Sequence, residues 1–293
     1  MNVQARGSSA AEFRFPDPPS LPEHLRQMRD QVRRFVEQTV VPNGEEWERA
    51  GKIPREIYRR MGELGLLGMR YPVEYGGTDL GPLASMVFSE ELGRCTFGGF
   101  TSSVLVHTDM SAGHIVLRGT PEQKAKYLPA IVRGETICSI AVTEAHAGSD
   151  VAGLKTRARK DGDDWVIDGS KMFITNAVYG DLLIVAARTD PEAKGSRGIS
   201  LFIVERDTPG VSAVKLDKHG WLCSDTAALT FDNVRVRKDA LLGEVNKGFY
   251  SIMETFQNER ICIGGICAGE SAKAIELTVD YVKTRRAFGD SLW

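Results

Sequence analysis

Apolar residues in the first third of the chain recur every three or four positions, which is the spacing of one face of a helix. One such stripe consists of Leu25, Met28, Val32, Phe35 and Val36, and a second consists of Ile57, Tyr58, Met61 and Leu64. Thr120-Pro121-Glu122 predicts the start of a last helix, because Thr is a favoured N-cap and Pro suits the first turn. We therefore expect a helical domain over residues 21–135, preceded by a loose tail over residues 1–20.

The pattern changes after residue 136 to short β-branched or alternating apolar runs, separated by clusters of Gly, Asp and Pro. The expected strands are Ile137–Val142, Trp165–Ile167, Leu182–Ala187, Ile199–Val204, Val211–Val214 and Ala228–Phe231. No apolar run of helix length lies between them, so a doubly wound parallel sheet is not expected. The pattern predicts an antiparallel β-barrel or sandwich domain over residues 136–242.

Helical spacing returns from Lys247 to Phe288. Small residues recur along one face of this helix at Gly265, Ala268, Gly269 and Ala272, so that another helix backbone could approach closely. No partner for that face is evident in the sequence, and no second helix follows before Trp293. We expect that another chain supplies the partner or that the sequence is truncated. Residues 243–293 are interpreted as the first helix of a C-terminal helical bundle, and the predicted fold class is α+β.

The charge balance excludes several classes of partner. The chain has 293 residues, with 37 basic and 39 acidic side chains. Near-neutral charge gives no electrostatic reason to bind nucleic acid or an anionic membrane surface. No apolar stretch reaches the length that spans a bilayer, so no membrane association is expected.

Cysteine and histidine usage gives no sign of a metal site. The five cysteines are scattered without a C-x-x-C pair, which is typical of a reducing cytoplasm. His107 and His114 lie seven residues apart but lack the other ligands of a metal site, so we expect no metal. The first residues lack the apolar core of a secretory signal and are weak as a transit peptide, so a bacterial-type cytosol is favoured over the mitochondrial matrix.

Two phrases carry the candidate chemistry. Val142 to Asp150 reads V-T-E-A-H-A-G-S-D, and Gly169 to Ala177 reads G-S-K-M-F-I-T-N-A. Each phrase places hydroxyl side chains, small residues and one ring where a strand leads into a loop. Together they indicate a bound flavin.

These phrases and four others in the same order resemble the acyl-CoA dehydrogenase family, from Leu21 to Trp293. The others are G-T-P-E-Q-K-A-K-Y-L-P, D-T-A-A-L-T-F-D-N-V-R-V, L-L-G-E-V-N-K-G-F and R-R-A-F-G. The resemblance implies a helical domain, a middle β domain and a C-terminal four-helix bundle, of which only the first helix is present. It also implies FAD as cofactor and α,β-desaturation of an acyl-CoA thioester as the reaction.

The resemblance assigns cofactor contacts to both phrases and to the end of the last helix. The implied contacts are Ile140, Ala141, Val142, Thr143, Ser149, Phe173, Ile174, Thr175, Arg285 and Phe288. The Thr143 hydroxyl would hydrogen-bond the flavin ring, and Arg285 and Phe288 would reach a flavin across a subunit interface. Two plainer interpretations stay open: Ser149 and Asp150 could cap an ordinary β-turn, and Arg285 could belong to a basic helix C-terminus.

Glu259 is the catalytic base that the resemblance implies. In the long-chain and isovaleryl branch the base lies in an E-R pair on the helix that opens the last domain, and here that helix reads F-Q-N-E-R-I-C-I-G-G. Beside apolar Ile261 and Ile263 a carboxyl group would be desolvated, which raises its pKa toward the range useful for proton abstraction. The alternative is a surface Glu beside Arg260. Ser149, Gln257 and Arg260 match the family's substrate contacts.

The resemblance also implies partners. These are an acyl-CoA substrate, an electron-transfer flavoprotein as electron acceptor, and either a homodimer or homotetramer or a heteromer with a chain that completes the bundle. Two alternative functions stay open: a non-catalytic or partner-completed subunit, and a flavin acyl-CoA oxidase or decarboxylating dehydrogenase. A flavin spectrum of the purified protein distinguishes the first alternative, and peroxide release and product mass distinguish the second.

Overall fold

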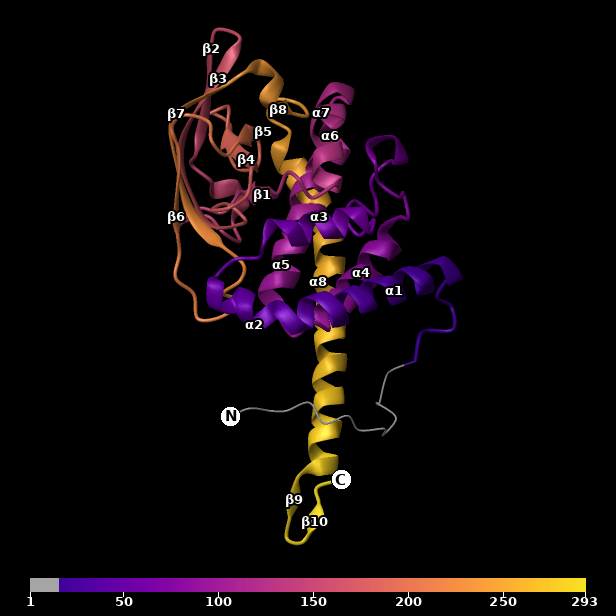
Figure 1. The fold of residues 1–293 in the computed structure, drawn as a ribbon. Coiled ribbons are helices and arrows are strands. Elements are labelled where there is room, and N and C mark those ends of the chain that lie inside the picture. Colours follow the sequence, from indigo (N-terminus) through magenta and orange to yellow (C-terminus); the bar gives the residue numbers. More distant parts are fainter. Residues whose placement is uncertain (1–15) are drawn as a thin grey trace.

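The computed structural model describes residues 16–293, so most of the expected tail lies outside the described residues. Figure 1 shows a layer of helices beside a twisted sheet. One long helix, α8 (Gly248–Thr284), passes along the helical layer and extends beyond it. Helices, sheet and a C-terminal helix therefore follow one another along the chain in the predicted order.

The N-terminal helices bury the two predicted stripes. They are α1 (Glu23–Phe35), η1 (Val36–Val40), α2 (Val41–Ala50), α3 (Arg55–Glu63), η2 (Val73–Tyr75), α4 (Pro82–Gly93), α5 (Gly98–Leu105), η3 (Val106–Ser111), α6 (Ala112–Arg118) and α7 (Pro121–Val132). The stripe that begins at Leu25 is buried throughout, and Tyr58 and Met61 of the second stripe are buried between half-buried neighbours. The predicted N-cap of α7 is confirmed: the Thr120 hydroxyl accepts from the Gln123 backbone N–H, and the Gln123 side chain bonds back to the Thr120 N–H.

The middle region is an open, sandwich-like sheet. Its strands are β1 (Cys138–Ala141), β2 (Arg157–Asp161), β3 (Asp164–Thr175), β4 (Leu182–Arg188), β5 (Ile199–Glu205), β6 (Val211–Lys215), β7 (Thr226–Val236) and β8 (Leu241–Leu242), with short helices η4 (Val151–Gly153) and η5 (Lys238–Ala240) between them. The strand order is β6-β7-β3-β2-β4-β5-β8, and β1 pairs with β4. The sheet is mostly antiparallel, as predicted, but β1 pairs with β4 in parallel, as does the end of β2. β2 escaped the sequence prediction because only Ala158 among its residues is buried.

The small-residue face of α8 has its partner within this chain, contrary to the expectation from the sequence. Gly265 and Gly269 are buried against α4. A Cβ atom at Gly265 would lie 2.8 Å from the carbonyl oxygen of Met86, and one at Gly93 of α4 would lie 2.6 Å from that of Ile266. The two helix backbones therefore touch, and α4 is the element that requires glycine on α8.

The last part of the chain differs from the prediction in one respect. The helix ends at Thr284 rather than Phe288, and β9 (Arg286–Ala287) and β10 (Asp290–Ser291) form a small hairpin beyond it. Figure 1 shows this hairpin at the far end of α8, away from the sheet. Within residues 16–293, α8 included, no helix combines the length and apolar content that crossing a membrane requires.

Candidate active site

The structure brings the two phrases of the candidate flavin site together. The backbone N–H of Met172 in β3 donates to the carbonyl oxygen of Thr143, just after β1, at 2.9 Å. Ala141, Val142 and Ile174 are buried, so these residues support the site from beneath. Ile140, Thr143 and Thr175 are half-buried, and Ser149 is exposed in the loop that follows β1.

Phe173 leaves the sheet at a bulge. The pairing of β3 with β7 changes register between Lys171 and Ile174. Phe173 adopts φ +62°, which a non-glycine residue rarely does, and 66% of its surface is exposed. An aromatic ring held out of a sheet in a strained backbone conformation is typical of a ligand-contacting position.

The donor set around this bulge fits a flavin. The hydroxyl groups of Thr143 and Thr175 form no hydrogen bond to any other part of residues 16–293. Both side chains are only half-buried, so their hydroxyls stay available to a ligand. A flat ring with oxygen and nitrogen atoms at its edge needs such donors beside an apolar surface, which Ile140 and Phe173 provide. The residues present therefore fit the FAD that the resemblance implies.

Glu259 is buried, which excludes its interpretation as a surface Glu paired with Arg260. It lies on α8 with 9% of its surface exposed, and its Oε1 atom has no hydrogen-bond partner within residues 16–293. The reason for its burial differs from the one expected, because Ile261 and Ile263 are themselves exposed. Glu259 instead belongs to the face of α8 that carries the buried residues Thr255 and Cys262.

Burial raises the pKa of Glu259 to about 8. The adjacent Arg260 opposes this shift, and the buried carboxylate of Asp109 on η3 adds to it. A carboxyl group with a pKa near neutrality can both accept and release a proton under working conditions. An unpartnered buried oxygen with such a pKa is the strongest candidate for a catalytic base in the described part of the chain.

This carboxyl group predicts a pH dependence of stability. The pKa of Glu259 is about 8 in the folded chain against 4.5 for the free group, so between these values the folded state holds a proton that the unfolded state has released. The free energy of unfolding therefore falls as pH rises through this window. We expect Glu259→Gln to lack this decline, so that its stability relative to the wild type increases from about pH 5 to about pH 8.

Urea unfolding at several pH values measures this difference. Glu270→Gln is the matched control, because Glu270 lies on the same helix and is exposed. The control should follow the wild type at each pH. Parallel curves for the wild type and Glu259→Gln would contradict the prediction.

An apolar cluster connects the Glu259 region of α8 with the strand β1. Val142 and Ile252 are buried in this cluster, and Ile140 and Phe256 pack against it. Glu259 follows Phe256 by three residues, which is close to one helical turn. The carboxyl group is thus held on an element that is packed against the same cluster as the candidate flavin strand.

Three hollows follow α8 in series towards Glu259. The first, outer hollow is lined by Asp190, Glu192, Ala193, Lys194, Arg197, Gly198, Asn246, Lys247 and Tyr250. The second is lined by Leu117, Arg118, Thr120, Leu242, Gly243, Glu244, Lys247, Gly248, Tyr250 and Ser251. The third, inner hollow is lined by Arg70, Tyr71, Gly113, Val116, Leu117, Glu254, Thr255 and Asn258. Their volumes are about 590, 630 and 100 Å³. Lys247 and Tyr250 line both the first and second hollows, and Leu117 lines both the second and third. The series begins among three basic and two acidic side chains and narrows beside the turn that carries Glu259.

The remaining predicted residues lie in two places. Gln257 and Arg260 are exposed on α8, where the Arg260 guanidinium lies 5.8 Å from the centre of the Phe256 ring. Arg285 and Phe288 are exposed at the far end of α8. At 1.5 Å per residue the helix places Arg285 roughly 39 Å from Glu259. The structure does not bring these two residues to the site of their own chain.

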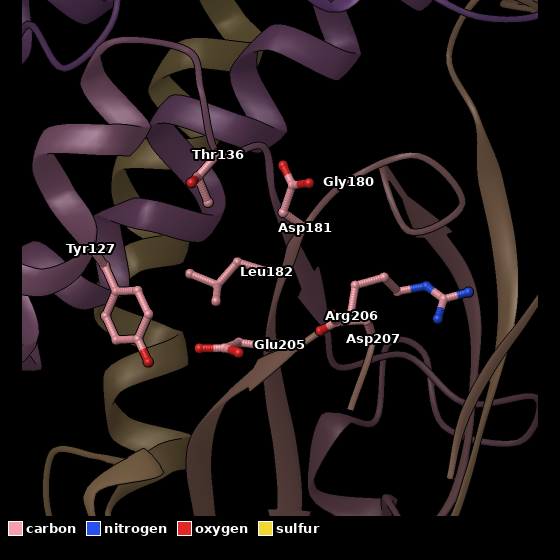
Figure 2. A pocket seen from close by; sticks show the side chains of 8 residues that line it. All are labelled: Tyr127, Thr136, Gly180, Asp181, Leu182, Glu205, Arg206 and Asp207. Atoms are coloured by element: carbon pink, nitrogen blue, oxygen red, sulfur yellow. The ribbon is translucent and has the colours of Figure 1, made fainter. Parts of the chain in front are cut away.

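The hollow in Figure 2 is a separate feature. It lies between α7 and the ends of β4 and β5, has a volume of about 410 Å³, and its lining includes Tyr127, Asp181 and Glu205. Two of its three carboxylates are already engaged: Asp181 accepts from Arg55 and from the Ile137 backbone N–H, and Glu205 lies 3.4 Å from the Lys126 amine. None of the predicted site residues lines it.

Two residues of the candidate site escaped the sequence prediction. Lys171 and Glu144 form a buried ion pair, with Nζ and Oε1 2.8 Å apart. Both residues lie inside the two flavin phrases, but nothing local in the sequence pairs them. The sequence offered two signals for this pair. Lys171 lies within an apolar strand, and Glu144 lies just after a buried strand.

Comparison with known proteins places this chain in a family. Sequence models of the acyl-CoA dehydrogenase N-terminal, middle and C-terminal domains match residues 22–135, 139–234 and 246–293. The long-chain specific acyl-CoA dehydrogenase of Mus musculus mitochondria is 41% identical over 268 residues, which are 90% of this chain and 61% of the relative. The chain thus spans about three fifths of the length of that curated relative.

Solved structures support the same family assignment. The crystal structure of an acyl-CoA dehydrogenase from Geobacillus kaustophilus has a TM-score of 0.89 and 42% identity, covering 94% of this chain and 72% of that one. A glutaryl-CoA dehydrogenase from Mycobacterium smegmatis, solved in complex with FADH2, has a TM-score of 0.86 and 33% identity, covering 93% of this chain and 68% of that one.

Proposed function

The chain belongs to the acyl-CoA dehydrogenase family, and from this premise we propose that it catalyses the FAD-dependent α,β-desaturation of an acyl-CoA thioester. The observation that carries the proposal is Glu259, a buried carboxyl group with an unpartnered oxygen. It lies on a helix that shares an apolar cluster with the strand of the first flavin phrase.

Each part of the site has a role in this reaction. Glu259 removes the α proton of the acyl group, and its pKa of about 8 suits that transfer. Thr143 and Thr175 would hold the polar edge of the flavin with their free hydroxyls, and Phe173 would cover its apolar face. FAD, when bound, supplies the acceptor for the β hydride. The buried residues beneath these groups keep water from the reacting atoms.

The hollows along α8 suit a coenzyme A thioester. The outer hollow carries three basic side chains, Lys194, Arg197 and Lys247, against two acidic ones, Asp190 and Glu192. Basic groups there would hold the phosphates of CoA. The inner hollow is the smallest of the three and ends near Glu259, where the acyl group would lie. Ser149, Gln257 and Arg260 are proposed as further substrate contacts on the exposed side of the site.

An absorbance spectrum followed by anaerobic addition of acyl-CoAs tests the proposal. We expect the purified chain, with FAD added if necessary, to show a flavin spectrum that bleaches with at least one acyl-CoA of a chain-length panel. Free CoA is the control, because it carries the same phosphates but no acyl α proton, and it should leave the spectrum unbleached. A chain that takes up no FAD, or whose flavin no acyl-CoA bleaches, contradicts the proposal.

A partner-completed subunit is the second candidate, and one observation favours it. The outer half of α8 exposes large apolar side chains at Ile275, Leu277 and Tyr281. Leu277 and Tyr281 lie four residues apart and share one face of the helix, and an exposed apolar face is typical of a surface that another helix covers. Appearance of the flavin spectrum only after a second polypeptide is added would favour this candidate over the self-sufficient enzyme.

The resemblance supports further proposals about partners and location. We propose an electron-transfer flavoprotein as the electron acceptor; peroxide release would indicate an oxidase, and a shortened product would indicate decarboxylation. We propose a homo-oligomer, because Arg285 and Phe288 lie too far along α8 to reach the flavin of their own chain. All five cysteines are free, which supports a reducing compartment such as the cytoplasm. Domain limits at residues 135 and 242 remain predictions.

A further inference from the structure

The Lys171 side chain is completely buried, and burial lowers the pKa of its amine to about 8 against the opposing effect of the Glu144 charge. Its Nζ atom donates to the carbonyl oxygen of Val142 at 3.0 Å and to the Glu144 carboxylate at 2.8 Å. Lys171 lies on β3 in the second flavin phrase, and both acceptors lie in the first phrase. The ion pair therefore connects the two segments that the proposed function assigns to FAD.

The Glu144 carboxylate is bound from several sides. Besides Lys171, its Oε1 accepts from the Thr156 backbone N–H at 2.9 Å and its Oε2 from that of Lys155 at 2.7 Å. Its own backbone closes a tight turn with Ala147 through two hydrogen bonds. Burial alone would raise the pKa of Glu144, but the charge of Lys171 and the hydrogen bonds lower it to about 2. The carboxylate is thus ionised and held in a single place.

The residues that would touch the flavin are direct neighbours of this pair. Thr143 precedes Glu144, and Phe173 follows Lys171 by two residues at the bulge of β3. The hydrogen bond from Met172 to Thr143 lies between the two side chains that would contact the flavin. A change in the ion pair would therefore move the Thr143 hydroxyl and the Phe173 ring relative to each other.

A buried ion pair is weak as a source of stability, because the loss of hydration offsets much of the attraction between the charges. An apolar or neutral replacement of both partners is often tolerated by a fold. In some proteins such a pair instead fixes the relative position of the groups that it connects. We infer that Lys171 and Glu144 are positioning residues that set the two flavin-contacting segments against each other, and that FAD affinity depends on them. This inference rests on the proposed function.

The double variant Lys171→Met/Glu144→Gln tests the inference without leaving an unpaired buried charge. We expect it to fold and to unfold cooperatively without FAD, but to bind FAD at least tenfold more weakly in a fluorescence titration. At saturating FAD, the visible circular dichroism of the bound flavin should also change, because the ring would lie in a differently shaped site. Arg159→Met is the matched control: Arg159 is exposed on the neighbouring strand β2, and its side chain forms no hydrogen bond or ion pair within residues 16–293.

The outcomes separate this inference from the proposed function. If the wild-type chain binds no FAD, both the proposed function and the positioning role of the ion pair are contradicted. A wild-type chain that binds FAD, with a double variant that binds it within twofold and with the same dichroism, overturns only the positioning role. If the double variant does not unfold cooperatively, Glu144→Gln alone carries the test, because its amide oxygen still accepts from Lys171 and from the Thr156 N–H, and only the hydrogen bond from Lys155 is lost. Loss of cooperative unfolding in both variants also overturns the inference, since the pair would then serve the fold.

Discussion

We expect Glu259→Gln to slow acyl-CoA desaturation by about a thousandfold or more while FAD stays bound, since a positioned general base contributes roughly 10²- to 10⁴-fold to such rates. Gln has the size of Glu but cannot accept the α proton. Flavin binding should persist, because the proposed contacts to the flavin ring lie on β1, on the loop after it and on β3 rather than on α8. The flavin spectrum of the variant should therefore match that of the wild type before substrate is added.

Stopped-flow measurement of flavin bleaching gives the rate of this step directly. In the wild type the rate should rise with pH as Glu259 loses its proton, with a pKa near 8 in the substrate-free chain, and this dependence should be absent from Glu259→Gln. Glu270→Gln, an exposed change on the same helix, should react at the wild-type rate. A rate for Glu259→Gln within tenfold of the wild type would assign the base elsewhere.

We expect Gly269→Ala to destabilise the chain by on the order of 3 kcal/mol, because extra volume at a tightly packed contact forces the backbone to shift. A Cβ atom at position 269 would overlap the carbonyl oxygen of Glu90 on α4. That oxygen belongs to a helix backbone and cannot rotate away. The helices would have to separate, which outweighs the gain of roughly 1 kcal/mol that Ala brings within a helix.

Gly264→Ala is the matched control on the same helix. A Cβ atom at Gly264 would meet no atom within 4 Å, so this variant should gain stability from the helix propensity of Ala. Urea unfolding of both variants gives the two free energies. A shift of both in the same direction would show that contact with α4 does not decide the effect.

The periodic parts of the fold were predictable from the sequence. The stripe that includes Val32 and Phe35 is buried, and the capping residue Thr120 begins α7 as predicted. These features depend on residues within one or two turns of each other. The strand β2 escaped prediction, because its register depends on pairing with β3 and only Ala158 is buried.

The sequence supplied candidate residues for the site but not the contacts that surround them. The resemblance named Glu259, and the structure buries it, yet the expected neighbours Ile261 and Ile263 are exposed. Its burial comes from the face of α8 that carries Thr255 and Cys262, and η3, which carries Asp109, packs against this helix. The small-residue spacing indicated a face of α8 that another helix could approach, but no sequence pattern indicates which distant segment lies against Glu259.

The order of residues along the chain was enough to indicate helices, a middle sheet, a last helix and two flavin phrases, because spacing and turn chemistry act between near neighbours. Contacts between distant segments required the folded structure: α4 against the glycines of α8, and Lys171 against Glu144. The separation of Arg285 from Glu259 likewise follows from the observed length of α8. Burial and ion pairing depend on which segments the fold brings into contact, and many pairings are compatible with the same local pattern.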